Sequence, residues 1–318
     1  MQVKLPAPAK INLHLAVTGK TSNGYHTLDT SFAYVDTGDT LLIDKAHGLC
    51  VTCSVADLNA RNNLVFRVLE GMRSTFNVAA GIKVHIEKSL PVQAGLGGGS
   101  SDAATAIMAA NTLWQLNLDS KILIEFATPF GADIPCFLFG RASRAIGVGE
   151  HLEPLKLDIE DKHVVLAHPG IGLSTADVFS CYDTAIKTGS KKTDALQLTP
   201  SKTEDTIRPD SIGRDGFTDG KGVRFPLGEN ALEAIACGMC PELAALLQFM
   251  RKQVKYTWMS GSGTACVALM ETEADAYRLA RELKRRRLAV WTHAGKILSR
   301  HPLREIELKP DDWGVAKR

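Results

Sequence analysis

Apolar and polar side chains alternate near the start of the chain, which is the pattern of a half-buried β-strand. Over residues 10–17, Lys10, Asn12 and their alternate neighbours share one face. The opposite, apolar face carries Ile11, Leu13, Leu15 and Val17. Similar short runs predict further strands over residues 30–35, 40–43, 82–86, 163–168, 256–259, 265–270 and 289–292.

Between these strands, apolar residues recur every three or four positions, as they do on one face of a helix. Helices are expected over residues 63–76, 102–114, 120–128, 175–182, around 231, 241–252 and 273–286. The mixture of antiparallel-looking strands and helices predicts an α+β fold. The length of 318 residues predicts two domains, which we place at residues 1–155 and 156–318. Residues 187–221 are polar and poor in large apolar side chains, so a long flexible loop is expected there.

Composition narrows the class of protein. The formal net charge of +2 argues against a dedicated nucleic-acid binder, which would carry a basic face. No apolar stretch has the length of a membrane span and the N-terminus lacks a signal-peptide core, so no membrane association and a cytoplasmic location are expected. The seven cysteines fit reduced thiols, and no histidine cluster accompanies their two CxxC pairs, so no metal site is expected. Nothing in the sequence indicates a protein partner.

The segment 91–101 is the strongest chemical signal in the chain. Four of the five residues at 95–99 are glycines, and an alanine-rich helix follows them. Such a loop leaves the backbone N–H groups open and places the positive end of a helix dipole beside them, which favours a phosphate. The loop lacks the lysine of a P-loop, and a dinucleotide fingerprint would need a glycine or alanine where Ser100 stands.

Phosphoryl transfer also needs a positive charge and a group that orients or deprotonates the acceptor hydroxyl. Lys10 is one candidate, although a single strand lysine is more often a solvated edge residue. Asp133, in the run Gly-Ala-Asp-Ile-Pro, is the other, although aspartate at such a place is often a helix cap or turn residue.

Four motifs, in this order along the chain, resemble those of the GHMP kinase superfamily. They are Pro-Ala-Lys-Ile-Asn-Leu at 8–13, the glycine-rich loop at 91–101, Gly-Ala-Asp-Ile-Pro at 131–135 and Ser-Gly-Ser-Gly at 260–263. Asn-Gly-Tyr-His at 23–26 is most similar to the members that phosphorylate a cytidine diphosphate-linked methylerythritol. The resemblance implies a two-domain fold with a left-handed βαβ crossover and an active-site cleft between the domains.

The same resemblance implies a set of site residues. Lys10 and Asp133 would be the catalytic pair, with ATP as phosphoryl donor and Mg²⁺ bridging its phosphates. Asn12, Tyr25, His26 and Phe179 would bind the small-molecule substrate that carries cytidine diphosphate. The implied ATP contacts are Pro91, Gly95, Leu96, Gly97, Gly98, Gly99, Ser100 and Ser101.

Two alternatives remain at this point. The chain could be a GHMP kinase for a different small alcohol, against which Tyr25 and His26 argue. It could also be a catalytically inactive metabolite sensor of the same fold, against which the presence of both Lys10 and Asp133 argues.

Overall fold

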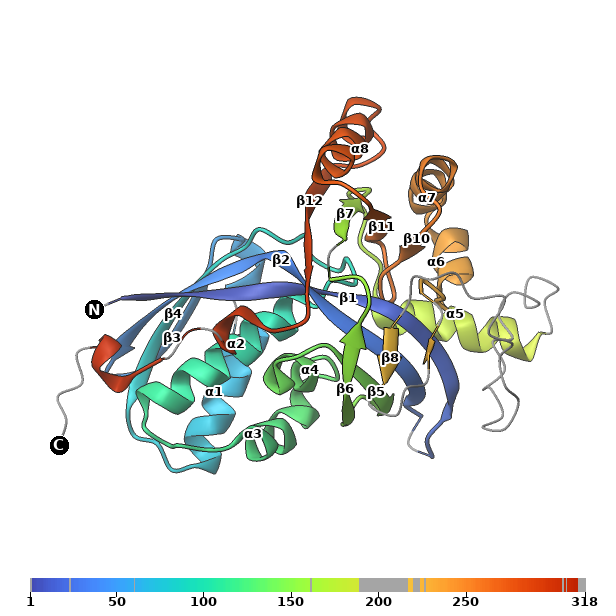
Figure 1. The fold of residues 1–318 in the computed structure, drawn as a ribbon. Helices are drawn as coiled ribbons and strands as arrows, with labels where there is room; N and C mark the ends of the chain where they lie inside the picture. The colour runs from blue at the N-terminus through green and yellow to red at the C-terminus, as the bar shows by residue number, and fades with distance from the viewer. Residues whose placement is uncertain are drawn as a thin grey trace.

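The computed structural model describes residues 2–22, 24–59, 61–160, 162–188, 217–219, 224–225, 227–304, 306 and 308–313. In this part of the chain the strands form a twelve-stranded sheet in the order β10-β11-β7-β12-β2-β5-β6-β8-β9, with β1, β3 and β4 joined beside β2. Helices α1–α4 gather near β1–β4, while α6–α8 gather near β7 and β10–β12 (Figure 1). The predicted α+β class is therefore confirmed.

The strands of the N-terminal half are β1 (Val3–Lys20), β2 (His26–Ala46), β3 (Leu49–Cys53), β4 (Gly81–Glu87), β5 (Ser143–Gly147) and β6 (His151–Leu157). Its helices are η1 (Ala56–Leu58), α1 (Leu64–Thr75), α2 (Gly98–Leu113), α3 (Ser120–Ala127), η2 (Thr128–Phe130) and α4 (Ile134–Phe139). Strands β1 and β2 pair antiparallel along most of their length. Strands β3 and β4 are parallel, and α1 connects them.

The strands of the C-terminal half are β7 (His163–His168), β8 (Phe217–Asp219), β9 (Arg224–Phe225), β10 (Thr257–Met259), β11 (Cys266–Met270) and β12 (Trp291–Leu298). Its helices are α5 (Thr175–Lys187), α6 (Glu233–Met239), α7 (Pro241–Gln253), α8 (Glu273–Arg285), η5 (Pro302–Arg304) and η6 (Pro310–Trp313). Strand β12 pairs with both β7 and β2 and thereby joins the two halves (Figure 1). No helix in the described part of the chain is long and apolar enough to cross a membrane.

Two details differ from the sequence-based expectation. The strands expected separately at 30–35 and 40–43 are one strand, β2, whose pairing with β1 shifts register between Pro8 and Ala9. A bulge of this kind lets the pairing of β1 with β2 continue past the register shift. Within the expected loop at 187–221, Phe217–Asp219 forms β8 on the edge of β6, where unpaired backbone groups favour an added strand. Residues 189–216 and 220–221 of that loop lie outside the described residues.

Three groups of buried apolar side chains make up the core. One lies under α1–α4, and a second packs α5–α8 against the C-terminal strands. The third joins β1 to β10 and β11 through side chains such as Ile11 and Trp258. Strand β6 crosses the domain boundary expected at residue 155. The halves are thus recognisable as separate cores, but a shared sheet and a shared apolar cluster connect them.

The α1 core generates a stability prediction. Leu69 on α1 is fully buried, so Leu69→Ala should leave a cavity and lower the free energy of unfolding by about 2–5 kcal/mol. Ile122 on α3 is 40% exposed, so Ile122→Ala should cost less than about 1 kcal/mol. Urea unfolding followed by circular dichroism compares the two. Equal losses for both variants would contradict this assignment of the core.

Candidate active site

The glycine-rich loop links β4 to α2 and depends on left-handed backbone conformations. Gly95 has φ +74° and Gly97 has φ +69°, and Gly97 is the N-cap of α2. The φ values of both residues suit glycine. No side chain caps this helix end, so its first N–H groups remain available to an anion.

Hydrogen bonds and a close backbone contact hold the loop on both sides. The backbone N–H of Lys10 in β1 donates to the carbonyl oxygen of Leu96 over 2.9 Å. The Ser260 hydroxyl donates to the carbonyl oxygen of Gly95 over 2.9 Å, and Ala265 N–H donates to that of Ala94. A Cβ atom at Gly95 would overlap the carbonyl oxygen of Ser260. The loop is therefore fixed between β1 and the turn at 260–263.

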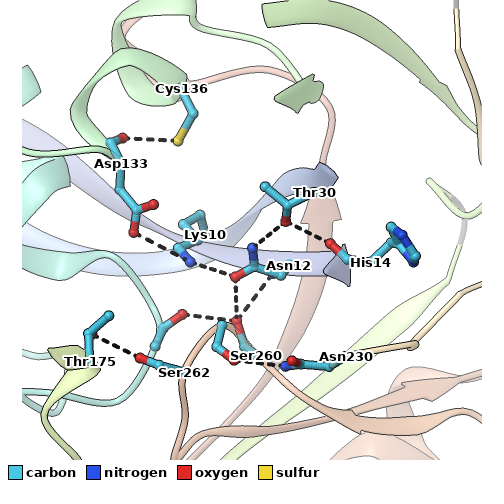
Figure 2. Close-up of polar contacts among 12 residues, drawn as sticks. Lys10, Asn12, His14, Thr30, Asp133, Cys136, Thr175, Asn230, Ser260 and Ser262 are labelled. Carbon is cyan, nitrogen blue, oxygen red and sulfur yellow. Dashed lines mark hydrogen bonds and ion pairs between the residues drawn. The ribbon is translucent and has the colours of Figure 1, made fainter. Parts of the chain in front are cut away.

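Lys10 and Asp133 meet beside this loop, as Figure 2 shows. Lys10 Nζ lies 3.5 Å from Asp133 Oδ2 and donates to Asn12 Oδ1 over 2.6 Å. The lysine side chain is 3% exposed and the aspartate side chain 36%. Burial does not leave the ammonium unpaired, because a carboxylate and an amide oxygen face it. The predicted catalytic residues are thus brought together, and the carboxylate is the more exposed of the two groups.

The alternative role for Asp133 can be tested against the geometry. Asp133 occupies the N-cap position of α4, but its side chain makes no capping hydrogen bond. Its backbone carbonyl oxygen accepts a hydrogen bond from the Cys136 thiol over 3.1 Å (Figure 2). Burial raises the pKa of that thiol well above its usual value, so the thiol stays protonated. The carboxylate of Asp133 is directed to Lys10 instead of to the helix.

Asn12 orients Lys10 through a chain of hydrogen bonds. Asn12 Nδ2 donates to Thr30 Oγ1 over 2.8 Å, and Thr30 Oγ1 donates to the carbonyl oxygen of His14 over 2.7 Å. This fixes the amide so that Oδ1 faces Lys10. The backbone N–H of Asn12 donates to Ser260 Oγ over 3.1 Å. Asn12, predicted as a substrate contact, is only 4% exposed and holds the Lys10 ammonium in place.

A cavity of about 600 Å³ contains this pair and the loop. Its lining includes residues 91–100, Lys10, Asn12, Asp133 and Phe179. Of the predicted ATP contacts, only Ser101 is outside the lining, and this residue is fully buried.

The residues predicted to bind the cytidine end lie beside α5. The His26 ring stacks on the Phe179 ring with centroids 4.5 Å apart and planes 22° apart. Tyr25 is 67% exposed, and neither Tyr25 nor His26 lines the cavity. The structure therefore brings His26 and Phe179 together directly and places Tyr25 at the surface next to them.

Two features of the site were not anticipated from the sequence. Lys88 donates to Asp102 Oδ2 over 2.8 Å and to Asp39 Oδ2, directly beneath the loop. Asp39 also accepts from the backbone N–H groups of Ser89 and Leu90. Burial raises the pKa of Asp102 to about 7. The position of Lys88 and Asp102 on either side of the loop was a visible signal, but Asp39 is far away in sequence.

The second feature is the support of the turn at 260–263. Asn230 Nδ2 donates to the carbonyl oxygens of Met259 and Gly261 over 2.8 and 2.7 Å. The hydroxyls of Thr175 and Ser262 are 2.9 Å apart and join the turn to the start of α5 (Figure 2). The Ser-Gly-Ser-Gly motif was a signal for this turn, but its partners were not.

Comparisons with known proteins define the class. The models of the GHMP kinases N-terminal domain and the GHMP kinases C-terminal domain match residues 63–141 and 227–289. The solved L. major mevalonate kinase in complex with R-mevalonate has the same fold, with a TM-score of 0.63 at 16% identity over 93% of this chain and 99% of that one. The matched domains and the shared fold place the chain in the GHMP kinase class.

Individual relatives narrow the family. The chain is 35% identical over 301 residues to the 4-diphosphocytidyl-2-C-methyl-D-erythritol kinase of Cupriavidus metallidurans. The match covers 94% of each chain. The chain is 34% identical to the enzyme of the same name from Paraburkholderia phytofirmans over 93% of this chain and 94% of that one. A crystal structure of 4-(cytidine 5'-diphospho)-2C-methyl-D-erythritol kinase matches with a TM-score of 0.69 at 30% identity, over 93% and 99%. The chain belongs to the 4-diphosphocytidyl-2-C-methyl-D-erythritol kinase family.

The contact between the loop and the turn yields a prediction. Gly95→Ala should lower the free energy of unfolding by about 1–3 kcal/mol, because φ is positive there and the methyl group overlaps Ser260. The matched control is Gly99→Ala in the first turn of α2, where nothing lies within 4 Å of an added Cβ. The control should be neutral or slightly stabilising. Urea unfolding of both variants measures the difference, and equal stability would contradict the tight contact.

Proposed function

We propose that this protein transfers the γ-phosphoryl group of ATP to the 2-hydroxyl of 4-diphosphocytidyl-2-C-methyl-D-erythritol, a step of the non-mevalonate route to isoprenoid precursors. The names of the relatives support the substrate and the reaction. The observation that carries the proposal is the placement of Asp133 and Lys10 in the same cavity as the glycine-rich loop. One cavity thus offers a phosphate site, a proton acceptor and a positive charge.

The residues divide the chemistry as follows. The loop at 91–101 and the free N–H groups of α2 bind the ATP phosphates. Asp133 accepts the proton of the substrate hydroxyl. The hydroxyl oxygen attacks the γ-phosphorus, and the bond from the γ-phosphorus to the bridging oxygen of ADP breaks. Lys10, which lies 3.5 Å from Asp133, neutralises charge on the phosphoryl group that is being transferred. Because Asn12 holds Lys10, the ammonium is in place before substrate binds.

Oxygen ligands near the loop fit a magnesium ion that arrives with ATP. Asp102 and Ser100 line the cavity, and Asp102 Oδ1 has no hydrogen-bond partner among the described residues. No group of three or more His, Cys, Asp or Glu side chains in the described part of the chain could hold a metal ion by itself. Magnesium commonly uses one or two protein oxygens together with substrate phosphates. When bound, it would neutralise phosphate charge.

The base of the substrate is assigned to the surface formed by Tyr25, His26 and Phe179. The exposed Tyr25 ring and the stacked rings of His26 and Phe179 offer flat faces, and the imidazole of His26 adds a ring nitrogen that can form a hydrogen bond. Such rings stack on nucleobases for about 1–3 kcal/mol each. This surface anchors the substrate at a distance from the reacting hydroxyl.

Substrate identity is tested by coupled ATP-consumption assays on a panel of alcohols. The cytidine diphosphate-linked methylerythritol should be phosphorylated efficiently, whereas free methylerythritol, mevalonate, homoserine and galactose should react poorly. Tyr25→Ala should raise KM for the cytidine-linked substrate by about tenfold or more and leave KM for ATP unchanged. Turnover of mevalonate, homoserine or galactose without turnover of the cytidine-linked compound would refute the substrate assignment.

The role of Asp133 is tested by Asp133→Asn. The amide preserves shape but cannot take the proton, so kcat should fall by about 10²-fold or more. Nucleotide affinity measured by calorimetry should change little, because Asp133 faces the acceptor hydroxyl, and circular dichroism should show that the variant is folded, because Asp133 makes no capping bond. Near-normal turnover would show that Asp133 is only a turn residue.

A further inference from the structure

A charged cluster lies behind His26, outside the catalytic pair. His26 Nε2 is 2.7 Å from Asp183 Oδ1, and Lys20 Nζ donates to Asp183 Oδ2 over 2.5 Å. Lys20 and His26 belong to the facing ends of β1 and β2, whereas Asp183 belongs to α5. Asp183 therefore connects the β1–β2 hairpin to the helix that also carries Phe179.

The cluster fixes the position of the imidazole. Stacking on Phe179 holds the plane of the ring, and Tyr182 meets its edge with centroids 6.3 Å apart. The hydrogen bond to Asp183 then fixes the rotation of the ring within that plane. The His26 side chain is 12% exposed, so this arrangement is largely protected from water.

The charge of Asp183 decides which ring nitrogen carries hydrogen. Hydrogen bonds from Lys20 and then His26 lower the pKa of Asp183, so its carboxyl is ionised at neutral pH. A carboxylate only accepts hydrogen bonds, so Nε2 must carry the hydrogen. In the neutral ring Nδ1 then has a lone pair. Nδ1 has no hydrogen-bond partner among the residues that the structure describes.

We propose that Asp183 is a positioning residue that fixes the orientation and tautomer of His26, so that Nδ1 accepts a hydrogen bond from the exocyclic amino group of cytosine. This inference rests on the proposed function, because it assigns the base to the surface beside His26. Cytosine presents an N–H₂ donor where uracil presents a carbonyl acceptor. A lone pair at Nδ1 favours the first base and repels the second, so Asp183 acts on base specificity through His26.

The kinetic test compares the cytidine-linked substrate with its uridine analogue. Wild-type protein should prefer cytidine by about tenfold or more in kcat/KM. In Asp183→Asn the amide can accept from or donate to Nε2, so both tautomers form. KM for the cytidine substrate should rise about tenfold and the preference should shrink, with kcat and KM for ATP unchanged. The control is Asp177→Asn, which removes the same charge from the exposed first turn of α5 and should keep the preference.

The structural test needs no substrate. In protein labelled with ¹⁵N-histidine, the His26 signals, identified by their loss in His26→Asn, should show hydrogen on Nε2 in the wild type and mixed tautomers in Asp183→Asn. Hydrogen on Nδ1 in the wild type overturns the proposal, even if the variant does not fold. Unchanged tautomer and base preference in the folded variant also overturn it. A wild type with the expected tautomer but no turnover of the cytidine-linked substrate refutes the proposed function, and with it the role of Asp183 in base specificity, while the link between Asp183 and His26 stands.

Discussion

Ser260 joins three distant segments of the chain, and the active site depends on that junction. Its hydroxyl accepts from the backbone of Asn12 and donates to the carbonyl oxygen of Gly95. The indole N–H of Trp258 donates to the carbonyl oxygen of Asn12 over 2.7 Å, which adds a second link between β10 and β1. The phosphate loop and the strand that carries Lys10 are therefore positioned by the C-terminal half of the chain. Neither half alone contains the complete geometry.

The buried ammonium of Lys10 explains why this junction must be rigid. Removing a charge from water costs several kcal/mol, and the cost is offset only when partners are well placed. Asn12 and Asp133 supply those partners, and the Phe32 ring lies 5.3 Å from Nζ. The Lys10 ammonium is held away from water. Because little solvent screens its charge, it interacts strongly with a nearby phosphoryl group.

Local signals in the sequence were sufficient for the glycine loop, since glycines and the helix after them are neighbours in the chain. The motifs also gave Lys10 and Asp133, but only the structure shows that they meet and that Asp133 does not cap α4. Strand β2 was expected as two separate strands, at 30–35 and 40–43. The sheet makes β2 continuous. Gly38 packs closely on β1, and Asp39 of β2 pairs with Lys88, which lies 49 residues later in the sequence. Such pairings depend on the sheet, which short-range patterns do not specify.

Helix α5 sets the distance between two parts of the molecule that contact its ends. Thr175 at its first residue is bonded to Ser262 beside the phosphate loop, and Asp183 near its other end is bonded to His26. Eight residues of α-helix separate these two anchors by about 12 Å. A helix cannot be stretched, so the distance between the turn at 260–263 and His26 is set by the number of residues between Thr175 and Asp183. A single-residue insertion in α5 would turn Asp183 about 100° around the helix axis and shift it by about 1.5 Å. The spacing between the turn beside the phosphate loop and the His26 ring therefore depends on the backbone of α5 and not on any one side chain.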